Sequence, residues 1–544
     1  MRPILRVLVP RRLSIAVVAI VFIAYNHFSD GVLSDNLFRP PAIPDDPPGA
    51  LDNHPVVKLH QQAQQDFKAL LARQSRNPDD AETEYRRRYR REPPAGFRQW
   101  VAHALANGSP IIDDFDIIAE SVHPFLKYSA QQVNQSVHDA QQQSKTKSTS
   151  ICKFSAGRFG SGCRAWSEPL TRLLGDAHRF LPDLELYINF LDEPSVLLGT
   201  EAATRDEGGA DETREKPMWT DLSHQSIAMA VSEACRERGD EFPQIKTAPP
   251  HDIMLDSSSL PSGKEFVWNP KMQKNLCQNA EYASQHGLVM CPATLQRLSS
   301  QVPLISRAAP YPFSDVLFPA THYSLKSSLY SSWSDRSWGA KKNAVYWAGS
   351  STGGHWTADT WVNGHRQRLV ALATGRAKTS TGGTVDTSRL DVALTRIVGC
   401  EPPKVCDAMS RFFSTGSRGR RDPEDRALRY RFALDVDGNS FSGRFYRLLA
   451  SRGVPLKMTI FREWHDDRLR AWVHYVPVSV GMEELPELVR FLTSTATGQR
   501  VSRSIADAGR EWYQRAVSPR HQGIYLYRLM LEMARVQDEL REAG

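Results

Sequence analysis

The segment Tyr430–Val478 constrains the fold more than any other part of the chain. It starts with an apolar run, Phe432–Val436, which ends in a turn rich in Gly and small polar residues. A helix-like stretch follows, and further apolar runs cover Leu456–Phe461 and Trp472–Val478. Short buried runs that alternate with a helix are typical of an α/β layer. We therefore expect strands connected through a helix in this region.

The turn that follows Val436 also suits an anion. Exposed backbone N–H groups in a strand-to-helix turn can bind phosphate oxygens, and the helix N-terminus adds positive potential. Arg444 lies just inside the expected helix, where its guanidinium can reach the same phosphates. A turn of this composition also occurs as a plain connection without any ligand, so on its own it leaves both interpretations open.

Several motifs in chain order resemble glycosyltransferase family 90, which holds the fungal capsule-associated proteins and the animal protein O-glucosyltransferases. They are Tyr89–Phe97, Ile111–Asp116, Asp437–Arg444 and Trp472–Val478. The resemblance covers roughly residues 80–540. It implies an α/β fold of the GT-B type, with two Rossmann-like domains that face a cleft. It also implies inverting sugar transfer from a UDP-sugar co-substrate, with no other cofactor.

At 544 residues, the chain is too long for a single hydrophobic core. We expect a cytoplasmic tail, a signal-anchor transmembrane helix, a helical stem, an acceptor-side α/β domain and a nucleotide-sugar-binding α/β domain. The boundaries we predict for these five segments are 1–12, 13–28, 29–80, 81–335 and 336–544.

The N-terminus predicts a membrane anchor. Four arginines, the last at position 12, precede the uncharged run Leu13–Tyr25. This run is shorter than the roughly 20 residues of a spanning helix, and a cleaved signal peptide has a similar profile, but the bulky residues that follow offer no cleavage site. A buried helix is the remaining alternative. The positive flank predicts a type II protein with a lumenal body, and the lack of a KDEL-like ending favours the Golgi membrane.

The net charge indicates which partners the protein can bind, and the cysteine content indicates whether it can form disulfides in an oxidising compartment. The net charge of +7 is modest, and the basic run Arg86–Arg91 is typical of a solvated helix face, so we expect no nucleic-acid partner. An oxidising lumen favours local disulfides. We predict Cys152–Cys163, Cys277–Cys291 and Cys400–Cys406, which leaves Cys235 free, and glycosylation sequons begin at Asn107 and Asn134.

Inverting transfer needs a base that takes the proton of the acceptor hydroxyl. Asp192 follows a short buried run, Leu184–Phe190, so it lies at the end of an expected strand. The resemblance assigns the base to Asp192, because family members have a similar strand that ends in Asp-x-Pro. The alternative is an Asp that only shapes a turn at the strand end, and the neighbouring Glu193 serves as a comparison.

The departing diphosphate needs fixed donors or cations. Gly349-Ser350 closes an expected strand, Ala344–Ala348, and Arg366 lies on the next expected helix, His365–Ala373. The resemblance implies that Ser350 and Arg366 bind the nucleotide sugar; a surface arginine is the alternative for the latter. We group with them the second turn, namely Asn439, Ser440, Phe441, Ser442, Gly443 and Arg444. Many members have Arg where this chain has Ala348, which leaves full activity in doubt.

Other chemical patterns are weaker. Asp435-Val436-Asp437 resembles a metal-binding Asp-x-Asp, but Asp435 falls inside a strand pattern, so we expect no metal. His465-Asp466-Asp467 and His322-Tyr323 have no metal-ligand spacing and read as solvated loop residues. Trp464 and Trp472 read as core residues. Asp315 is expected to line the cleft.

These observations favour a type II Golgi glycosyltransferase that moves xylose or glucose from a UDP donor to a glycan or glycoprotein, as in capsule or cell-wall glycan synthesis. A catalytically inactive lumenal carbohydrate-binding protein on the same fold is the alternative, and Ala348 motivates it. A glycoside hydrolase ranks last, because no motif brings two carboxylates together.

Overall fold

The computed structural model of the chain describes residues 53–199, 217–240, 254–255, 266–324, 328–379, 386–413, 423 and 425–540. The expected tail 1–12 and anchor 13–28 lie outside the described residues, as does the part of the stem before residue 53. Within the described part, no helix has both the length and the apolar character needed to cross a bilayer.

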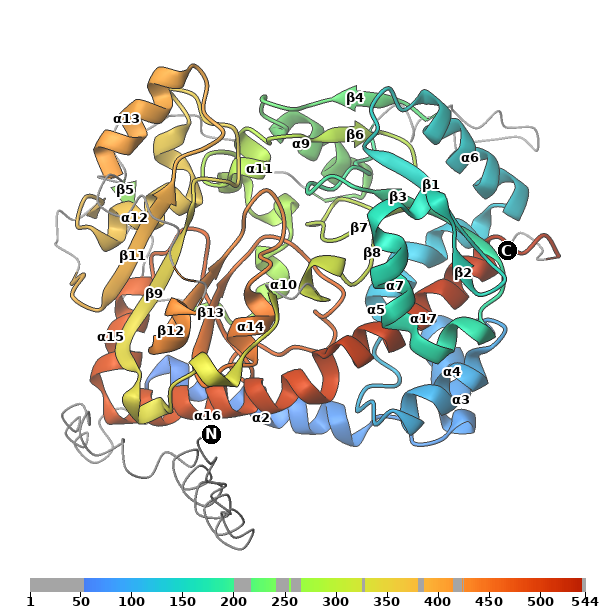
Figure 1. Cartoon of the computed structure of the whole chain (residues 1–544), viewed down its shortest axis with the longest axis horizontal. Helices are drawn as coiled ribbons and strands as arrows, with labels where there is room; N and C mark the ends of the chain where they lie inside the picture. Colours follow the sequence, from blue (N-terminus) through green and yellow to red (C-terminus); the bar gives the residue numbers. More distant parts are fainter. Residues whose placement is uncertain are drawn as a thin grey trace, which may run out of the picture.

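The protein is a mixed α/β molecule with two five-stranded sheets (Figure 1). In the first sheet the order is β2-β1-β3-β7-β8; β1 pairs antiparallel with β2 and β3, while β3, β7 and β8 are parallel. Its strands are β1 Thr149–Ser155, β2 Arg158–Phe159, β3 Leu184–Asn189, β7 Leu304–Ser306 and β8 Val316–Leu317. The strand predicted before Asp192 is thus β3, and it lies at the centre of this sheet.

The second sheet is entirely parallel, in the order β11-β9-β12-β13-β14. Its strands are β9 Lys342–Ser350, β11 Leu390–Arg396, β12 Tyr430–Val436, β13 Val454–Met458 and β14 Val476–Pro477. The helix α14, Phe445–Leu449, connects β12 with β13 as expected. The third apolar run forms only the short β14, because Trp472 bends the chain with a φ of 64°. Its ring is buried, as predicted for a core residue.

The two ends of the chain cross between the sheets. The helix α17, Pro519–Val536, packs on β3 and on helices α4, Phe97–Ala106, and α7, Ser167–Leu174, of the first half. In Figure 1 it is the red helix that runs below the teal elements. Conversely, α2, Pro55–Ala72, lies along α16, Ala496–Trp512, of the second half. Each half is therefore completed by the far end of the chain.

This crossing corrects the predicted stem. Residues 55–72 form the expected helix, but α2 is part of the folded body: Val56 is fully buried, and the His60 ring lies 2.6 Å from the carbonyl oxygen of Trp472. The predicted stem also includes the start of a second helix, at residue 78. The Asn77 side chain caps a helix there, α3 Pro78–Tyr89. The long helix α16 was not predicted.

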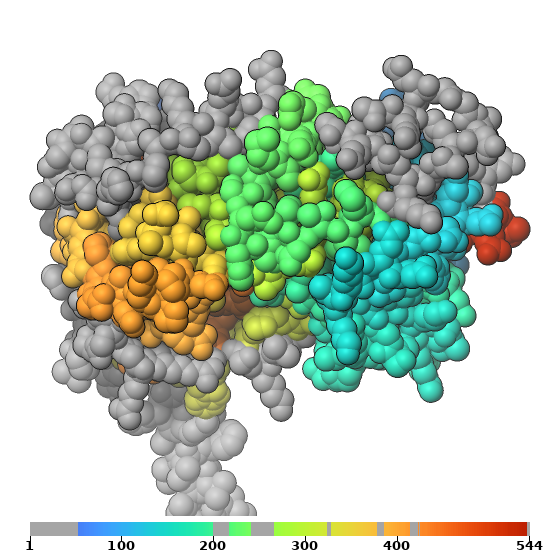
Figure 2. All heavy atoms as spheres, turned by 90° about the horizontal axis from the view of Figure 1, so that it is seen from above, coloured from blue at the N-terminus to red at the C-terminus, as the bar shows by residue number. Residues whose placement is uncertain are grey.

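Smaller elements cover the sheets. They are α5 Asp116–Val122, α6 Ala130–Gln143, α9 Ala228–Glu237, α10 Pro270–Gln273, α11 Gly287–Met290, α12 His365–Ala373, α13 Pro403–Phe413 and α15 Leu485–Ser494. Two further strand pairs are β4 Trp219–Asp221 with β6 Gln296–Leu298, and β5 Met254–Leu255 with β10 Lys378–Thr379. Seen from above, the surface is hollowed between the orange residues of α13 and the cyan residues of the first half (Figure 2).

Two of the three predicted disulfides are present, Cys152–Cys163 and Cys400–Cys406. The third prediction was wrong: Cys235 pairs with Cys277 over 42 residues, and Cys291 is the buried free thiol. Packing of α9 against the segment around Cys277 brings these two sulfurs together. Sequence proximity therefore predicted the wrong partner for Cys277, because tertiary packing brings Cys235 closer to it.

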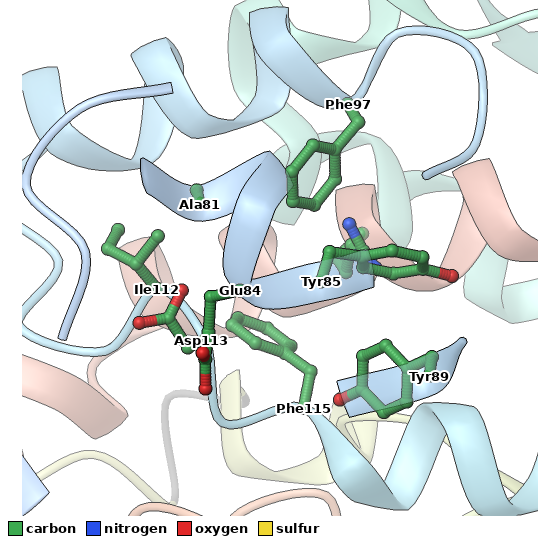
Figure 3. A pocket seen from close by; sticks show the side chains of 9 residues that line it. Ala81, Glu84, Tyr85, Tyr89, Phe97, Ile112, Asp113 and Phe115 are labelled. Atoms are coloured by element: carbon green, nitrogen blue, oxygen red, sulfur yellow. The ribbon is translucent and has the colours of Figure 1, made fainter. Parts of the chain in front are cut away.

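A small cavity lies between α3, α4 and α17 (Figure 3). Tyr85, Phe97 and Phe115 form much of its wall, and Arg528 reaches it from α17. It has room for about one water molecule. It is therefore a packing defect of the helical layer, too small for a sugar nucleotide.

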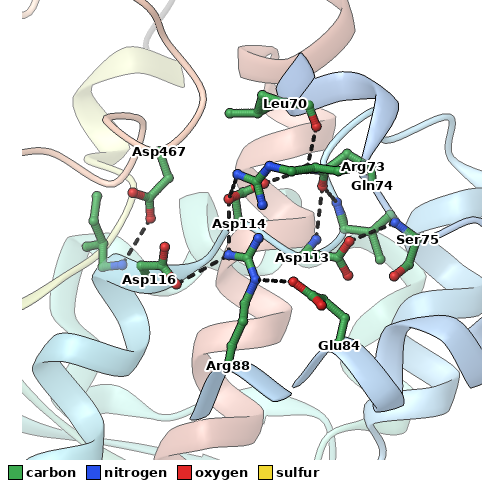
Figure 4. Close-up of polar contacts among 12 residues, drawn as sticks. Leu70, Arg73, Gln74, Ser75, Glu84, Arg88, Asp113, Asp114, Asp116 and Asp467 are labelled. Carbon is green, nitrogen blue, oxygen red and sulfur yellow. Dashed lines mark hydrogen bonds and ion pairs between the residues drawn. The ribbon is translucent and has the colours of Figure 1, made fainter. Parts of the chain in front are cut away.

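The Asp-rich motif at 111–116 holds this helical layer together (Figure 4). The Asp114 carboxylate pairs with Arg88 at 3.0 Å and is almost fully buried. Next to the motif, the backbone N–H of Ile117 donates to the carboxylate of Asp467 at 2.9 Å. Asp467 was expected in a solvated loop, but it is buried and ties the first half to the second. The motif that resembles the family is structural here.

Candidate active site

The two Gly-rich turns lie side by side at one edge of the second sheet. Because β9 and β12 are neighbouring parallel strands, the turns at their carboxyl ends meet, and this is where ligands of such sheets bind. The backbone N–H of Gly353 donates to Asn439 Oδ1 at 2.9 Å. At Gly353 φ is 113°, and a Cβ would lie 2.7 Å from the His365 ring, so the turn needs glycine.

Arg366 is a buried clamp between the two turns. Its Nε donates to the Asp437 carbonyl at 2.6 Å, and Nη2 donates to the Val436 carbonyl at 2.9 Å. Nη1 donates to the Ser350 carbonyl at 3.0 Å and to Thr352 Oγ1 at 2.7 Å. Four N–H groups are thus used within the protein, so the geometry does not offer a planar fork to a phosphate. The surface-arginine alternative is wrong, because only 6% of Arg366 is exposed.

Arg366 still brings positive charge to the turns. Burial lowers its pKa to about 9, with the charge of Arg444 adding to this effect, so the guanidinium is protonated at neutral pH. Arg444 itself is half-buried just before α14, and its Nη1 donates to the Ala348 carbonyl at 2.8 Å. The backbone at Ala348, where many family members have Arg, therefore contacts a cation supplied by the neighbouring turn.

The remaining residues of the second turn have different environments. The Ser440 hydroxyl is buried, and no residue of the described part of the chain forms a hydrogen bond with it. The Phe441 ring packs 5.2 Å from Tyr323, and the Tyr323 hydroxyl lies 3.4 Å from the Ser442 carbonyl oxygen. Asn439 uses its side-chain oxygen on Gly353. The turn is thus held from both sides.

Asp192 is exposed at the end of β3, where the sequence placed it. Its carboxylate pairs with Arg307 at 2.5 Å. The Arg307 side chain is mostly buried and stacks 4.9 Å from the Trp166 ring, so it holds the carboxylate in place. The neighbouring Glu193 differs, because it is 1% exposed and accepts N–H donors from the segment at 293–294.

His322 links Asp192 to the second turn, and sequence reasoning missed this. A Cβ at Gly443 would lie 2.4 Å from the His322 ring, so the ring rests directly on the turn. His322 also lies within the electrostatic reach of Arg307 and Asp192: partial desolvation and then Arg307 lower the pKa of His322, while Asp192 opposes them. The sequence shows His322 next to Tyr323, but nothing in it indicates that the histidine ring contacts Gly443.

Both acidic residues of the Asp-x-Asp pattern are buried and used internally. Asp435 pairs with Lys457 at 3.0 Å, and Asp437 accepts the backbone N–H of Ile460 at 2.9 Å. Lys457 also lies 3.4 Å from Glu463. These carboxylates stabilise the base of the turn and face protein cations rather than open space.

Two further expectations need correction. His465, read as a solvated loop residue, is 1% exposed, and its Nδ1 lies 3.0 Å from the Tyr446 hydroxyl. Asp315 does not line an open cleft: it is buried and accepts the backbone N–H groups of Ser195 and Val196 at 2.9 Å each. It therefore shapes the loop that follows Asp192. Trp464 is fully buried, as predicted.

The fold and the site define an α/β protein whose polar and cationic groups gather at the carboxyl edge of a parallel sheet. Residues 292–540 match the model of Glycosyl transferase family 90. This part of the chain is similar to glycosyltransferase family 90, in agreement with the motifs. The match includes both turns, Arg307 and His322, whereas Asp192 lies before it.

A curated relative points the same way. The chain is 38% identical over 85 residues to an O-glucosyltransferase rumi homolog of Aedes aegypti. This stretch covers 15% of the chain and 20% of the relative, so the chain matches only a fifth of that protein's length.

Proposed function

We propose that the protein is an inverting glycosyltransferase that moves a sugar from a UDP donor to a hydroxyl of a glycan or glycoprotein. The observation that carries this proposal is the joined pair of turns at the edge of a parallel sheet, with two arginines beside them. The family match supports sugar transfer. The O-glucosyltransferase relative makes glucose a first choice of sugar to test, with xylose as the second.

In this proposal the diphosphate lies against the turn at Ser350 and the turn from Asn439 to Arg444. Backbone N–H groups and the Ser440 hydroxyl donate to phosphate oxygens, and Arg366 and Arg444 supply charge. The arginine charge stabilises the phosphate that departs as the bond to the anomeric carbon breaks. No bound metal is needed for this step, because the cations belong to the protein.

Asp192 takes the acceptor proton as the hydroxyl oxygen attacks the anomeric carbon. Its contact with Arg307 holds the carboxylate in place, and the ionised carboxylate is the form that accepts a proton. The His322 ring rests on the donor turn and lies within the electrostatic reach of Asp192, which supports a base close to that turn. The proton moves to Asp192, the new glycosidic bond forms with inversion, and UDP leaves.

This division of labour corresponds to the GT-B arrangement, with acceptor residues on the first sheet and donor residues on the second. We further propose the N-terminal anchor of residues 13–28 and a Golgi location, with the folded body in the lumen.

A donor screen tests the proposed function. Purified protein is mixed with UDP-glucose, UDP-xylose and other UDP-sugars, with and without glycan acceptors, and released UDP is measured. We expect acceptor-stimulated UDP release with one donor. Binding of UDP-sugars without turnover would favour the inactive carbohydrate-binding protein, and cleavage of glycosides without nucleotide would favour a hydrolase.

A further inference from the structure

Three potential metal ligands meet on the molecular surface, apart from the proposed donor site. They are His224, His355 and Glu401, and one ligand atom of each lies within 4.8 Å of the other two. Nε2 of His355 is 3.2 Å from Glu401 Oε2, and the two imidazole rings stack with centroids 3.6 Å apart. We infer that these residues form a binding site for a divalent cation of the zinc type.

The backbone holds all three ligands in place before any ion binds. The N–H of His224 donates to the Pro292 carbonyl at 2.8 Å, and the N–H of His355 donates to the adjacent Cys291 carbonyl at 2.7 Å. The loops that carry His224 and His355 are thus both hydrogen-bonded to the dipeptide Cys291-Pro292. The N–H of Glu401 donates to the carbonyl of the residue after His355 at 2.9 Å. Because the backbone of the three ligands is already held, the binding of an ion requires little ordering of the backbone.

The ligand types match zinc. Two imidazoles and one carboxylate form a common protein set for Zn²⁺, with the fourth position left to water. A coordinated ion must lie in the plane of each ring, and the two rings are only 16° from parallel. One ring must therefore turn on binding, and His224, which is exposed, is free to do so.

The position of the site gives the ion a defined role. His355 follows the Gly-rich turn after β9, whereas His224 belongs to the segment 217–240, drawn green in Figure 2 beside the yellow and orange segments. An ion would cross-link this segment to the turn and to the loop after β11. It would therefore stabilise the fold and stiffen the first turn from outside. This inference does not depend on the proposed function.

The test uses the full-length chain without a histidine tag, stripped of metal. Zn²⁺ is titrated against a chromogenic chelator, and melting is followed with and without Zn²⁺. We expect one saturable site and a higher Tm with Zn²⁺. Affinity should fall ~10-fold or more in His224→Asn, His355→Ala and Glu401→Gln. The first of these suits its backbone, because Asn tolerates the φ of 63° at this position.

The matched control is His138→Ala. His138 lies 3.3 Å from Glu185 on the surface, so it offers one imidazole and one carboxylate but no second ring. This variant should bind Zn²⁺ as the parent protein does. The inference would be overturned if the His224 and His355 variants bound Zn²⁺ as tightly as the parent protein. It would also be overturned if His138→Ala lost as much affinity as those variants, or if the parent protein showed no saturable binding. If His355→Ala fails to fold, His224→Asn and Glu401→Gln decide the question, because both side chains are exposed.

Discussion

The backbone N–H of Gly353 donates to the side-chain oxygen of Asn439, and this 2.9 Å bond joins two turns 86 residues apart. Neither turn is a complete anion site alone. Once joined, they align the carboxyl ends of β9 and β12, and the buried Ser440 hydroxyl has no hydrogen-bond partner among the residues that the structure describes. Asn439 is thus an organiser of the site, and the residues around it are the ones to test for phosphate contact.

Asp192→Asn should lower turnover by roughly 100-fold or more, the usual scale for loss of a general base. UDP affinity should change little, because the donor residues lie on the other sheet. Turnover and UDP binding are measured on the same preparation. Asp79→Asn is the control, since Asp79 is another exposed carboxylate paired with an arginine, Arg98 at 2.7 Å. Near-normal turnover in Asp192→Asn would remove it from the mechanism.

Arg444→Ala should weaken UDP binding by about 10- to 150-fold, because charge-assisted hydrogen bonds contribute roughly 1.5–3 kcal/mol and each decade corresponds to about 1.36 kcal/mol. Titration calorimetry with UDP measures the change. Arg447→Ala, on the same helix, is the control. Unchanged affinity in Arg444→Ala would place the nucleotide elsewhere.

Arg366→Ala should weaken UDP binding and also lower Tm. Its side chain satisfies three buried carbonyl groups, and each orphaned group costs about 1–3 kcal/mol. This revises the simpler expectation from sequence, in which both arginines act on the phosphates alone. Thermal unfolding of Arg366→Ala and Arg444→Ala separates the structural role of Arg366 from phosphate binding. Equal Tm values in the two variants would contradict the role of Arg366 as a clamp between the turns.

Turnover should survive EDTA, because the cations of the proposed donor site are arginines. Asp435→Asn should instead reduce stability by roughly 3–5 kcal/mol, since it breaks a buried pair with Lys457. Denaturant unfolding and assays with and without Mn²⁺ or Mg²⁺ measure both effects. Activity that requires either ion and disappears in a well-folded Asp435→Asn would move the assignment to a metal-dependent transferase.

Acid should destabilise the protein in part through His521. Burial, with Arg468 and Arg520 adding, lowers the pKa of His521 from 6.5 to about 4. Between these values the unfolded chain holds more protons than the folded one, so stability is complete above pH 6.5 and is lost as the pH falls towards about 4. From pH 7.5 to 4.5, Tm should fall further in the parent protein than in His521→Gln. Parallel curves would show that this histidine does not contribute.

The N-terminal arginines before Leu13 predict that the anchor is retained and that the body is lumenal. In sealed microsomes, a C-terminal tag should resist protease until detergent is added. A cytoplasmic marker digested in both conditions confirms that the protease is active. Digestion of the tag without detergent would contradict this topology.

Local patterns predicted the elements that bear the site. The apolar runs marked β3, β9, β12 and β13, and the helix expected at His365–Ala373 has these bounds in the structure. The joined turns followed from neighbouring parallel strands, whose carboxyl ends meet at one edge. These features depend on contacts close in sequence or on a rule of sheet topology, so a single chain carries enough information to predict them.

Features that depend on distant partners were not predictable. Asp467 reads as a loop residue until Ile117, 350 positions earlier, donates to it. Cys235 finds Cys277 rather than remaining free, and Arg366 reads as a phosphate ligand until three carbonyls converge on it. In each case the burial of a polar group is decided by a segment that sequence spacing does not bring near.

The crossing of the chain ends has a consequence for synthesis. Every residue of α17 from His521 to Met533 is buried, and this helix covers β3 and the helices around it. Domains usually fold in order as the chain leaves the ribosome. Here the first half emerges with an uncovered apolar face and waits for the last helix to be translated. Nascent chains should therefore depend on chaperones until translation ends, and a stop codon shortly before Pro519 should leave the first half without the helix that covers it.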